Sequence, residues 1–130
     1  MATTPNFAST PKAAIALLSA ANTSRAGSGT IVDLLSAGAS GQLVNRVDVT
    51  AIGTTTAGVI RLFLHNGTSY FMFEEILVTA ITPSTSVAVW SGASAKITPA
   101  KPFLVPTGWK LAASTHNSES FNATVNGGDY

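Results

Sequence analysis

The chain has 130 residues, of which 45% are hydrophobic and 10% charged, with no cysteine and a formal net charge of +1. Its length predicts one domain, and its hydrophobicity with low net charge excludes a disordered chain. Without cysteine there are no disulfides or thiolate metal sites. The seven basic residues are scattered singly, which argues against nucleic acid as the main partner, and no apolar run approaches the ~20 residues that span a membrane.

Residues 1–12 contain Pro5 and Pro11 and show no periodicity, so we expect an extended N-terminal arm before a folded domain over residues 13–130. After the arm, apolar residues recur at every second position wherever a pattern can be recognised, which is typical of β-strands. The expected strands cover residues 14–20, 30–36, 43–52, 59–65, 68–78, 86–90, 95–98, 103–105, 109–114 and 121–125.

Alternation is clearest over residues 43–52. Leu43, Val47 and Val49 fall on one face of the expected strand, and Asp48 falls on the other. We therefore predict one face in the core and one in water.

Residues 59–65 alternate in the same way, with Ile60 and Leu62 on the dry side and Arg61 and His65 on the wet side. Asn66-Gly67 then separates two β-rich segments. This dipeptide predicts a hairpin with a type I′ turn, in which both central residues have positive φ.

Short strands at regular spacing, with no helical stripe and no fixed repeat, predict an all-β fold. The expected architecture is an antiparallel β-sandwich of the jelly-roll type, with eight core strands and extra strands at the edge.

Few residues are available for catalysis. Glu74 and Glu75 are adjacent in a strand and point to opposite faces, so they do not form the carboxylate pair of a glycosidase. His65 and His116 lack the spacing and acidic neighbours of a metal site, and we expect both to be solvated turn residues. The prediction is a protein with no enzymatic activity, no catalytic residue, no metal and no cofactor.

Three aromatic residues have two interpretations. Trp90 is expected to pack in the core or at an interface, and Trp109 to cover one end of the sandwich. In the alternative, Tyr70, Trp90 and Trp109 are exposed and contact sugars or proteins.

A string of short segments carries a family resemblance. They are NTSRAGSGT (22–30), GTTTAGVIRLFLHNGT (53–68), AITPS (80–84), PTGWKLAAST (106–115), FN (121–122) and GGDY (127–130). Together they resemble a family of small proteins encoded in tailed-bacteriophage genomes. The resemblance implies a structural virion protein, a capsid decoration or cement protein with a jelly-roll body. On this basis we expect it on the outer capsid surface, bound to the major capsid protein and to copies of itself as a homodimer or homotrimer.

The arm lies outside these segments. We hypothesise that it contacts the major capsid protein or an adjacent copy, with Pro5, Phe7, Pro11 and Lys12 as candidate contacts. The alternative function is a tail or head-fibre recognition module that binds host surface glycans. Cementing predicts broad, flat contacts, whereas glycan binding predicts an exposed aromatic platform beside polar groups.

Overall fold

The computed structural model describes residues 10–130, which form nine β-strands. In chain order they are β1 (Thr10–Leu18), β2 (Val32–Ser36), β3 (Gln42–Ala51), β4 (Gly58–His65), β5 (Tyr70–Val78), β6 (Ser91–Ala93), β7 (Phe103–Val105), β8 (Lys110–Thr115) and β9 (Phe121–Asp129). Within residues 10–130, no helix has the length and apolar character needed to cross a membrane.

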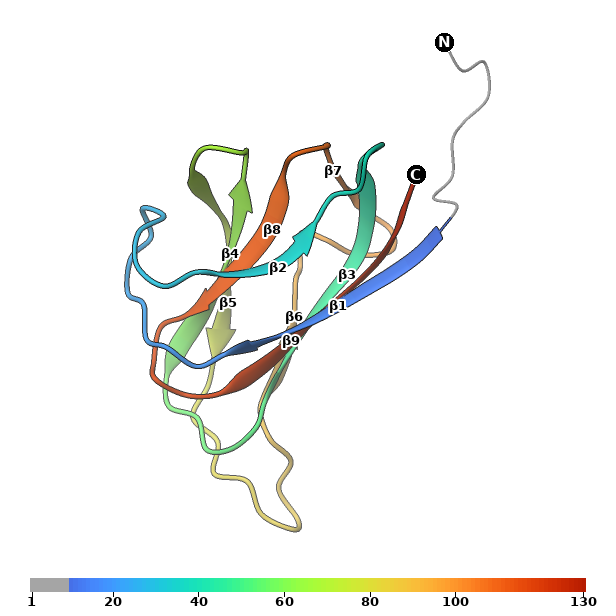
Figure 1. Cartoon of the computed structure of the whole chain (residues 1–130). Helices are drawn as coiled ribbons and strands as arrows, with labels where there is room; N and C mark the ends of the chain where they lie inside the picture. Colours follow the sequence, from blue (N-terminus) through green and yellow to red (C-terminus); the bar gives the residue numbers. More distant parts are fainter. Residues whose placement is uncertain (1–9) are drawn as a thin grey trace.

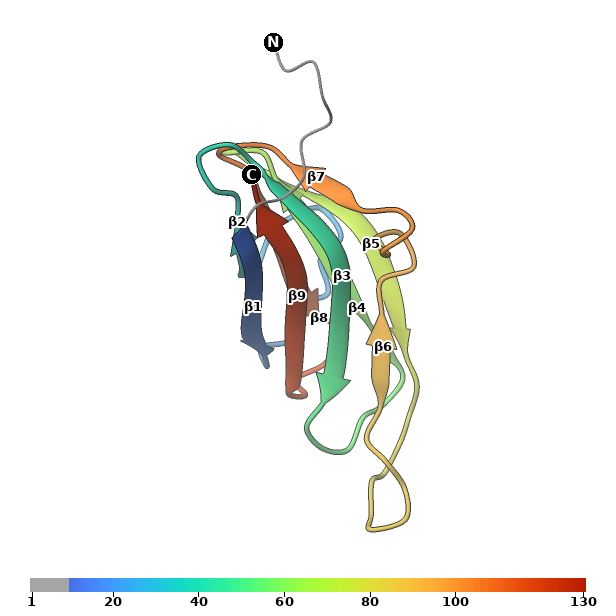
Figure 2. The ribbon, with the colours of Figure 1, turned by 90° about the vertical axis from the view of Figure 1, so that its right-hand side faces the viewer.

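The strands form two antiparallel sheets that pack face to face (Figure 1). The first sheet has the order β1-β9-β3-β6, and β7 also pairs with β3; the second has the order β2-β8-β4-β5. Figure 2 shows β1, β9, β3 and β6 of the first sheet side by side, with the second sheet behind them. The prediction of an all-β antiparallel sandwich is confirmed.

The strand pairs are nested in the sequence. β4 pairs with β5, β3 with β6, β2 with β8, and β1 with β9. Successive pairs alternate between the two sheets. The outermost pair places Thr10 opposite Asp129, so the two ends of residues 10–130 meet at one end of the first sheet.

The core lies between the sheets and consists of aliphatic side chains from both inner faces, together with aromatic rings. Trp90 and Phe121 pack edge to face with ring centroids 5.8 Å apart, an arrangement that aromatic quadrupoles favour. Fully buried members of the core include Val44, Val47, Val49, Ile60, Leu62, Leu111, Ala123 and Val125.

A β-bulge in β3 changes the expected alternation. The register with β9 shifts between Val44 and Arg46, which leaves Asn45 as the extra residue. An extra residue reverses the faces on which side chains point. Val44 and Val47 are therefore both buried, while Leu43, which we predicted in the core, is only half-buried on the opposite face.

The predicted hairpin connects β4 and β5, but its turn differs from the prediction. The loop covers residues 66–69, and only Gly67 has positive φ, at 95°. A type I′ turn needs positive φ at both central residues, so that prediction is wrong. Instead, Oδ1 of Asn66 accepts hydrogen bonds from the backbone N–H groups of Thr68 and Ser69, both at 3.0 Å.

Two expected strands, over residues 86–90 and 95–98, do not form. β6 begins only at Ser91, after a turn in which the N–H of Ser84 donates to the Val87 carbonyl oxygen at 2.9 Å. Residues 94–97 turn around Ser94, whose Oγ accepts a hydrogen bond from the N–H of Ile97 at 2.9 Å. Local turns supply these backbone hydrogen bonds, so β-propensity alone does not produce a strand.

The start of β1 corrects the predicted end of the arm. β1 begins at Thr10 and pairs with β9 from there, so Pro11 and Lys12 belong to the folded domain and not to an arm that reaches residue 12. Nζ of Lys12 donates to the Ser36 carbonyl oxygen at 3.0 Å and lies 3.4 Å from the Asp129 carboxylate. The side chain of Lys12 thus ties β1 to the end of β2.

Candidate functional site

The four candidate arm contacts have different positions. Pro5 and Phe7 lie outside the described residues. Pro11 is exposed near the start of β1, at the edge of the first sheet. Lys12 is half-buried, and its ammonium group already bonds Ser36 and Asp129. Of these four residues, the structure therefore places Pro11 on an open edge.

The three candidate exposed aromatics are not grouped on the surface. Trp90 is 5% exposed and packs in the core, so its assignment as an exposed aromatic is wrong. Trp109 is half-buried against the core. Tyr70 is also half-buried; its hydroxyl donates to Oδ1 of Asp33 at 2.8 Å, and its ring lies 4.4 Å from that of His65.

A polar cluster lies on the outer face of the second sheet, centred on Arg61. Ile60 and Leu62 point into the core, so Arg61 between them points away from it, as the alternation predicts. It does not reach water, however, because only 1% of its side chain is exposed. Its Nη1 donates to the Asn22 carbonyl oxygen at 2.9 Å, and Asn22 lies in the connection between β1 and β2. Because of this cover, the prediction of a wet Arg61 is wrong.

The Arg61 cluster also contains Arg25, Glu75 and His116. Oε2 of Glu75 accepts hydrogen bonds from Nε of Arg25 at 2.8 Å and from Nε of Arg61 at 2.9 Å. The hydrogen bond from Arg25, reinforced by the Arg61 guanidinium, holds the pKa of Glu75 below its ordinary value. Nη2 of Arg61 lies 3.0 Å from Nδ1 of His116. A guanidinium only donates, so Nδ1 accepts, and His116 is a half-buried network member where we predicted a solvated residue.

Each of the six acidic side chains has a local partner within residues 10–130. The pairs are Asp33 with Tyr70, Asp48 with Arg46, Glu74 with Ser94, Glu75 with Arg61, Glu119 with Thr56, and Asp129 with Lys12. Within residues 10–130, no group of three acidic or histidine side chains lies close enough together to hold a metal ion. Five of these six contacts join different strands or connections, which is a structural role, and the Arg46–Asp48 pair lies within β3.

The broadest candidate contact surface is the outer face of the first sheet. We define the outer face as the side chains of Ala13, Ile15 and Leu17 on β1, Asn122, Thr124 and Asn126 on β9, Arg46, Asp48 and Thr50 on β3, and Ser91 and Ala93 on β6. Its two charged groups, Arg46 and Asp48, pair with each other at 2.7 Å. The remaining side chains are small, amide, hydroxyl or aliphatic groups.

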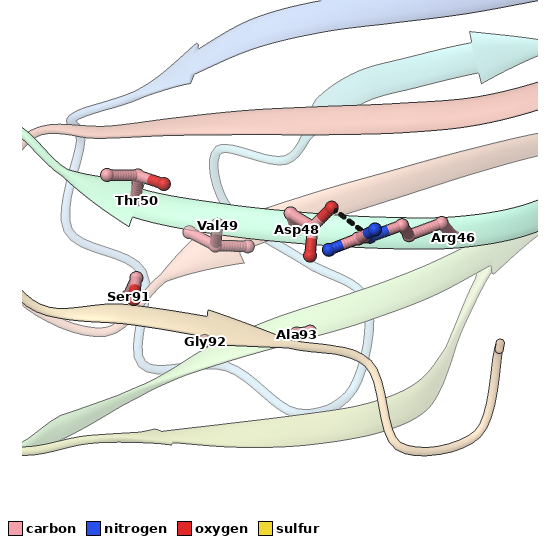
Figure 3. Close-up of a pocket in the computed structure, with 7 residues that line it drawn as sticks. All are labelled: Arg46, Asp48, Val49, Thr50, Ser91, Gly92 and Ala93. Atoms are coloured by element: carbon pink, nitrogen blue, oxygen red, sulfur yellow. Dashed lines mark ion pairs between the residues drawn. The ribbon is translucent and has the colours of Figure 1, made fainter.

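A shallow hollow of about 430 Å³ lies in the outer face between β3 and β6. Figure 3 shows the paired side chains of Arg46 and Asp48 beside the short β6 strand. Gly92 in β6 lacks a side chain for a packing reason: a Cβ there would lie 2.7 Å from Cζ2 of the buried Trp90 ring. The two exposed side chains of β6 beside the hollow, Ser91 and Ala93, are also small.

In comparisons with known proteins, no protein-family model and no curated protein matches the chain.

Proposed function

We propose that the chain is a structural virion protein that decorates the outer surface of a tailed-phage capsid and stabilises it. In this proposal it binds the major capsid protein and neighbouring copies of itself. The observation that carries the proposal is the outer face, a broad sheet surface of uncharged side chains and one ion pair, Arg46 with Asp48. A partner can cover such a surface with little desolvation of charge, and its amide and hydroxyl groups can hydrogen-bond across an interface.

Two further lines of support come from the chain. The segments between residue 22 and the end resemble the tailed-phage family. The nested strand pairs, with sheet orders β1-β9-β3-β6 and β2-β8-β4-β5, are those expected of a long hairpin rolled into a jelly roll with β7 added. We therefore propose the jelly-roll topology as well, which occurs in viral capsid proteins and also in lectins.

Each of the six acidic side chains forms a hydrogen bond or an ion pair with another side chain of residues 10–130, and this supports a non-catalytic role without a cofactor. Burial of Trp90 and partial burial of Trp109 favour cementing over glycan recognition, which needs an exposed aromatic platform.

The test compares cryo-electron-microscopy maps of virions with and without the gene in the phage that encodes it. We expect β-sandwich density to disappear from the outer capsid surface, and particles without the gene to lose DNA at lower temperature. Density lost from a tail or fibre, with an unchanged shell, would overturn the proposal in favour of the recognition module.

Variants of the outer face make the test specific to this surface. Thr50 and Asn122 are opposite each other on β3 and β9, and both are exposed. The double substitution Thr50→Glu and Asn122→Glu places two negative charges there, and we expect it to reduce shell occupancy at least tenfold. The matched control is Thr68→Glu, at an exposed position in the β4–β5 hairpin of the other sheet. Equal occupancy of both variants would show that the outer face does not bind the shell.

A further inference from the structure

The four edges of the two sheets are not equally protected against pairing with another strand. In the first sheet, one edge is made by β6 and β7, which have three residues each. In the second sheet, the register of β2 with β8 and of β5 with β4 shifts at a bulge. Short strands and bulges are common protections of sheet edges. β1 has neither: it has nine residues and an unbroken register with β9.

Pro11 shows which backbone groups of β1 face the open edge. It lies within the β1–β9 ladder, opposite Gly128. Because proline has no N–H, its nitrogen must point away from the partner strand. Alternate residues share this direction. Ala13, Ile15 and Leu17 therefore direct their N–H and C=O groups to the open edge, where no strand of residues 10–130 pairs with them.

The same three residues form an apolar, uncharged stripe on the outer face. Ile15 is 75% exposed and Leu17 is 53% exposed. No charged residue occurs from Ala13 to Leu18. Two copies of this stripe can meet without like-charge repulsion, and the first charge on β1, Lys12, is already paired with Asp129.

From this edge we infer that two copies of the chain pair through β1, antiparallel and about a twofold axis at Ile15, and so join two first sheets into one continuous sheet. This inference deepens the proposed function by naming the surface through which the protein binds itself. An antiparallel pair of identical strands is self-complementary, as a twofold interface requires. It also satisfies the open backbone groups by strand addition.

Pro11 also selects the register. With the axis at Ile15, Ala13 lies opposite Leu17 of the second copy, and the outward residues form three hydrogen-bonded pairs, with about six backbone hydrogen bonds. An axis at Ala14 would form four pairs but place Pro11 opposite Leu17 in two of them. The number of hydrogen bonds would stay at about six, while two Leu17 carbonyl oxygens would face a proline ring and have no donor. An axis at Ala16 would place Ala13 opposite Ser19, beyond the end of β1.

The interface is small. Pairing of two edge strands covers less than the ~1,200 Å² of total surface that specific, stable interfaces bury. We therefore expect a dimer that dissociates on dilution and is favoured by the high local concentration on a shell.

Disulfide trapping tests the pairing and its register, since the chain has no cysteine of its own. Hydrogen-bonded antiparallel pairs have Cα atoms about 5.5 Å apart, within the range of a disulfide. Ile15→Cys in the full chain should form a covalent dimer under mild oxidation. In this register the two Leu17 residues are about 13 Å apart, so Leu17→Cys should form at least tenfold less. Leu77→Cys, on β5 with 69% exposure, controls for random collision.

Sedimentation of the cysteine-free protein gives the second measurement. As the concentration increases, the apparent mass should rise from 13.3 kDa toward twice that value. The variant Ile15→Lys would bring two ammonium groups together in the dimer. It should therefore remain monomeric, with an unchanged melting temperature. Equal trapping of Ile15→Cys and Leu77→Cys, or self-association of Ile15→Lys at the original strength, would overturn the inference. If trapping fails while virions that carry the gene show the chain on the shell, the inference fails and the proposed function stands. If trapping succeeds while those virions show no density for the chain on the shell, the proposed function fails and the inference stands.

Discussion

Nη2 of Arg61 lies 3.0 Å from Nδ1 of His116, so an arginine side chain that is 1% exposed contacts the residue that directly follows the neighbouring strand β8. The other two hydrogen bonds of Arg61 reach Glu75 on β5 and Asn22 in the β1–β2 connection. One buried side chain thus joins three parts of the chain that are far apart in sequence. Buried charges are tolerated when such partners surround them.

Removal of this guanidinium should destabilise the fold. We expect Arg61→Ala to lower the free energy of unfolding by about 2–5 kcal/mol, because it leaves a cavity and unpaired polar groups. The control is Arg46→Ala, which removes an ion pair whose arginine is 61% exposed and should cost less than about 1 kcal/mol. Urea unfolding monitored by tryptophan fluorescence measures both. Equal losses would contradict a special role for Arg61.

Glu75 should contribute to acid sensitivity. Its folded pKa lies below the ordinary value of 4.5, chiefly because of the Arg25 hydrogen bond. For a lowered pKa, the stabilisation is complete above the unfolded pKa and disappears as the pH falls through the folded pKa. The free energy of unfolding should therefore fall less between about pH 6 and pH 3 for Glu75→Gln than for the unchanged chain. Parallel pH profiles for the two proteins would rule out this contribution.

Alternation of apolar and polar residues predicts the sandwich because it records which face of a strand is dry, and the Asn66-Gly67 dipeptide predicts the β4–β5 hairpin. The bulge at Asn45 could not be predicted this way, since one extra residue reverses the pattern without a distinctive local sequence. As a result Leu43 was expected in the core and Val44 was not.

The Arg61 cluster was missed for a different reason. Alternation correctly places Arg61 on the face of the second sheet that points away from the core. It contains no information about the β1–β2 connection, which covers that outer face. Contacts such as that with Asn22 are long-range in sequence. The charged residue within an otherwise apolar segment was the available signal, and it indicated exposure, which is the usual state of arginine.

Tyr70 should ionise at higher pH than an ordinary tyrosine. Its hydroxyl donates to Asp33, and this hydrogen bond, with burial and the Asp33 charge, raises the pKa of Tyr70 above 10.0. Asp33→Asn should therefore lower the pKa of Tyr70, measured by NMR titration of the ring carbons. A raised pKa stabilises the fold below the unfolded value, and this stabilisation is lost as the pH rises through the folded value. Tyr70→Phe, which cannot ionise, should lack that loss. An unchanged titration in Asp33→Asn would contradict the assigned cause.

Gly127 should tolerate no side chain, because the β3 bulge brings the backbone of Leu43 against it. A Cβ at Gly127 would overlap the Leu43 carbonyl oxygen and approach Cα of Val44 to 3.0 Å. Since backbone atoms cannot move aside as a side chain can, we expect Gly127→Ala to cost about 3 kcal/mol or more in free energy of unfolding. The control is Gly53→Ala, where a Cβ meets nothing within 4 Å and stability should change by less than about 1 kcal/mol. Thermal unfolding followed by circular dichroism compares them. Similar melting temperatures would show that β3 and β9 do not approach this closely at the bulge.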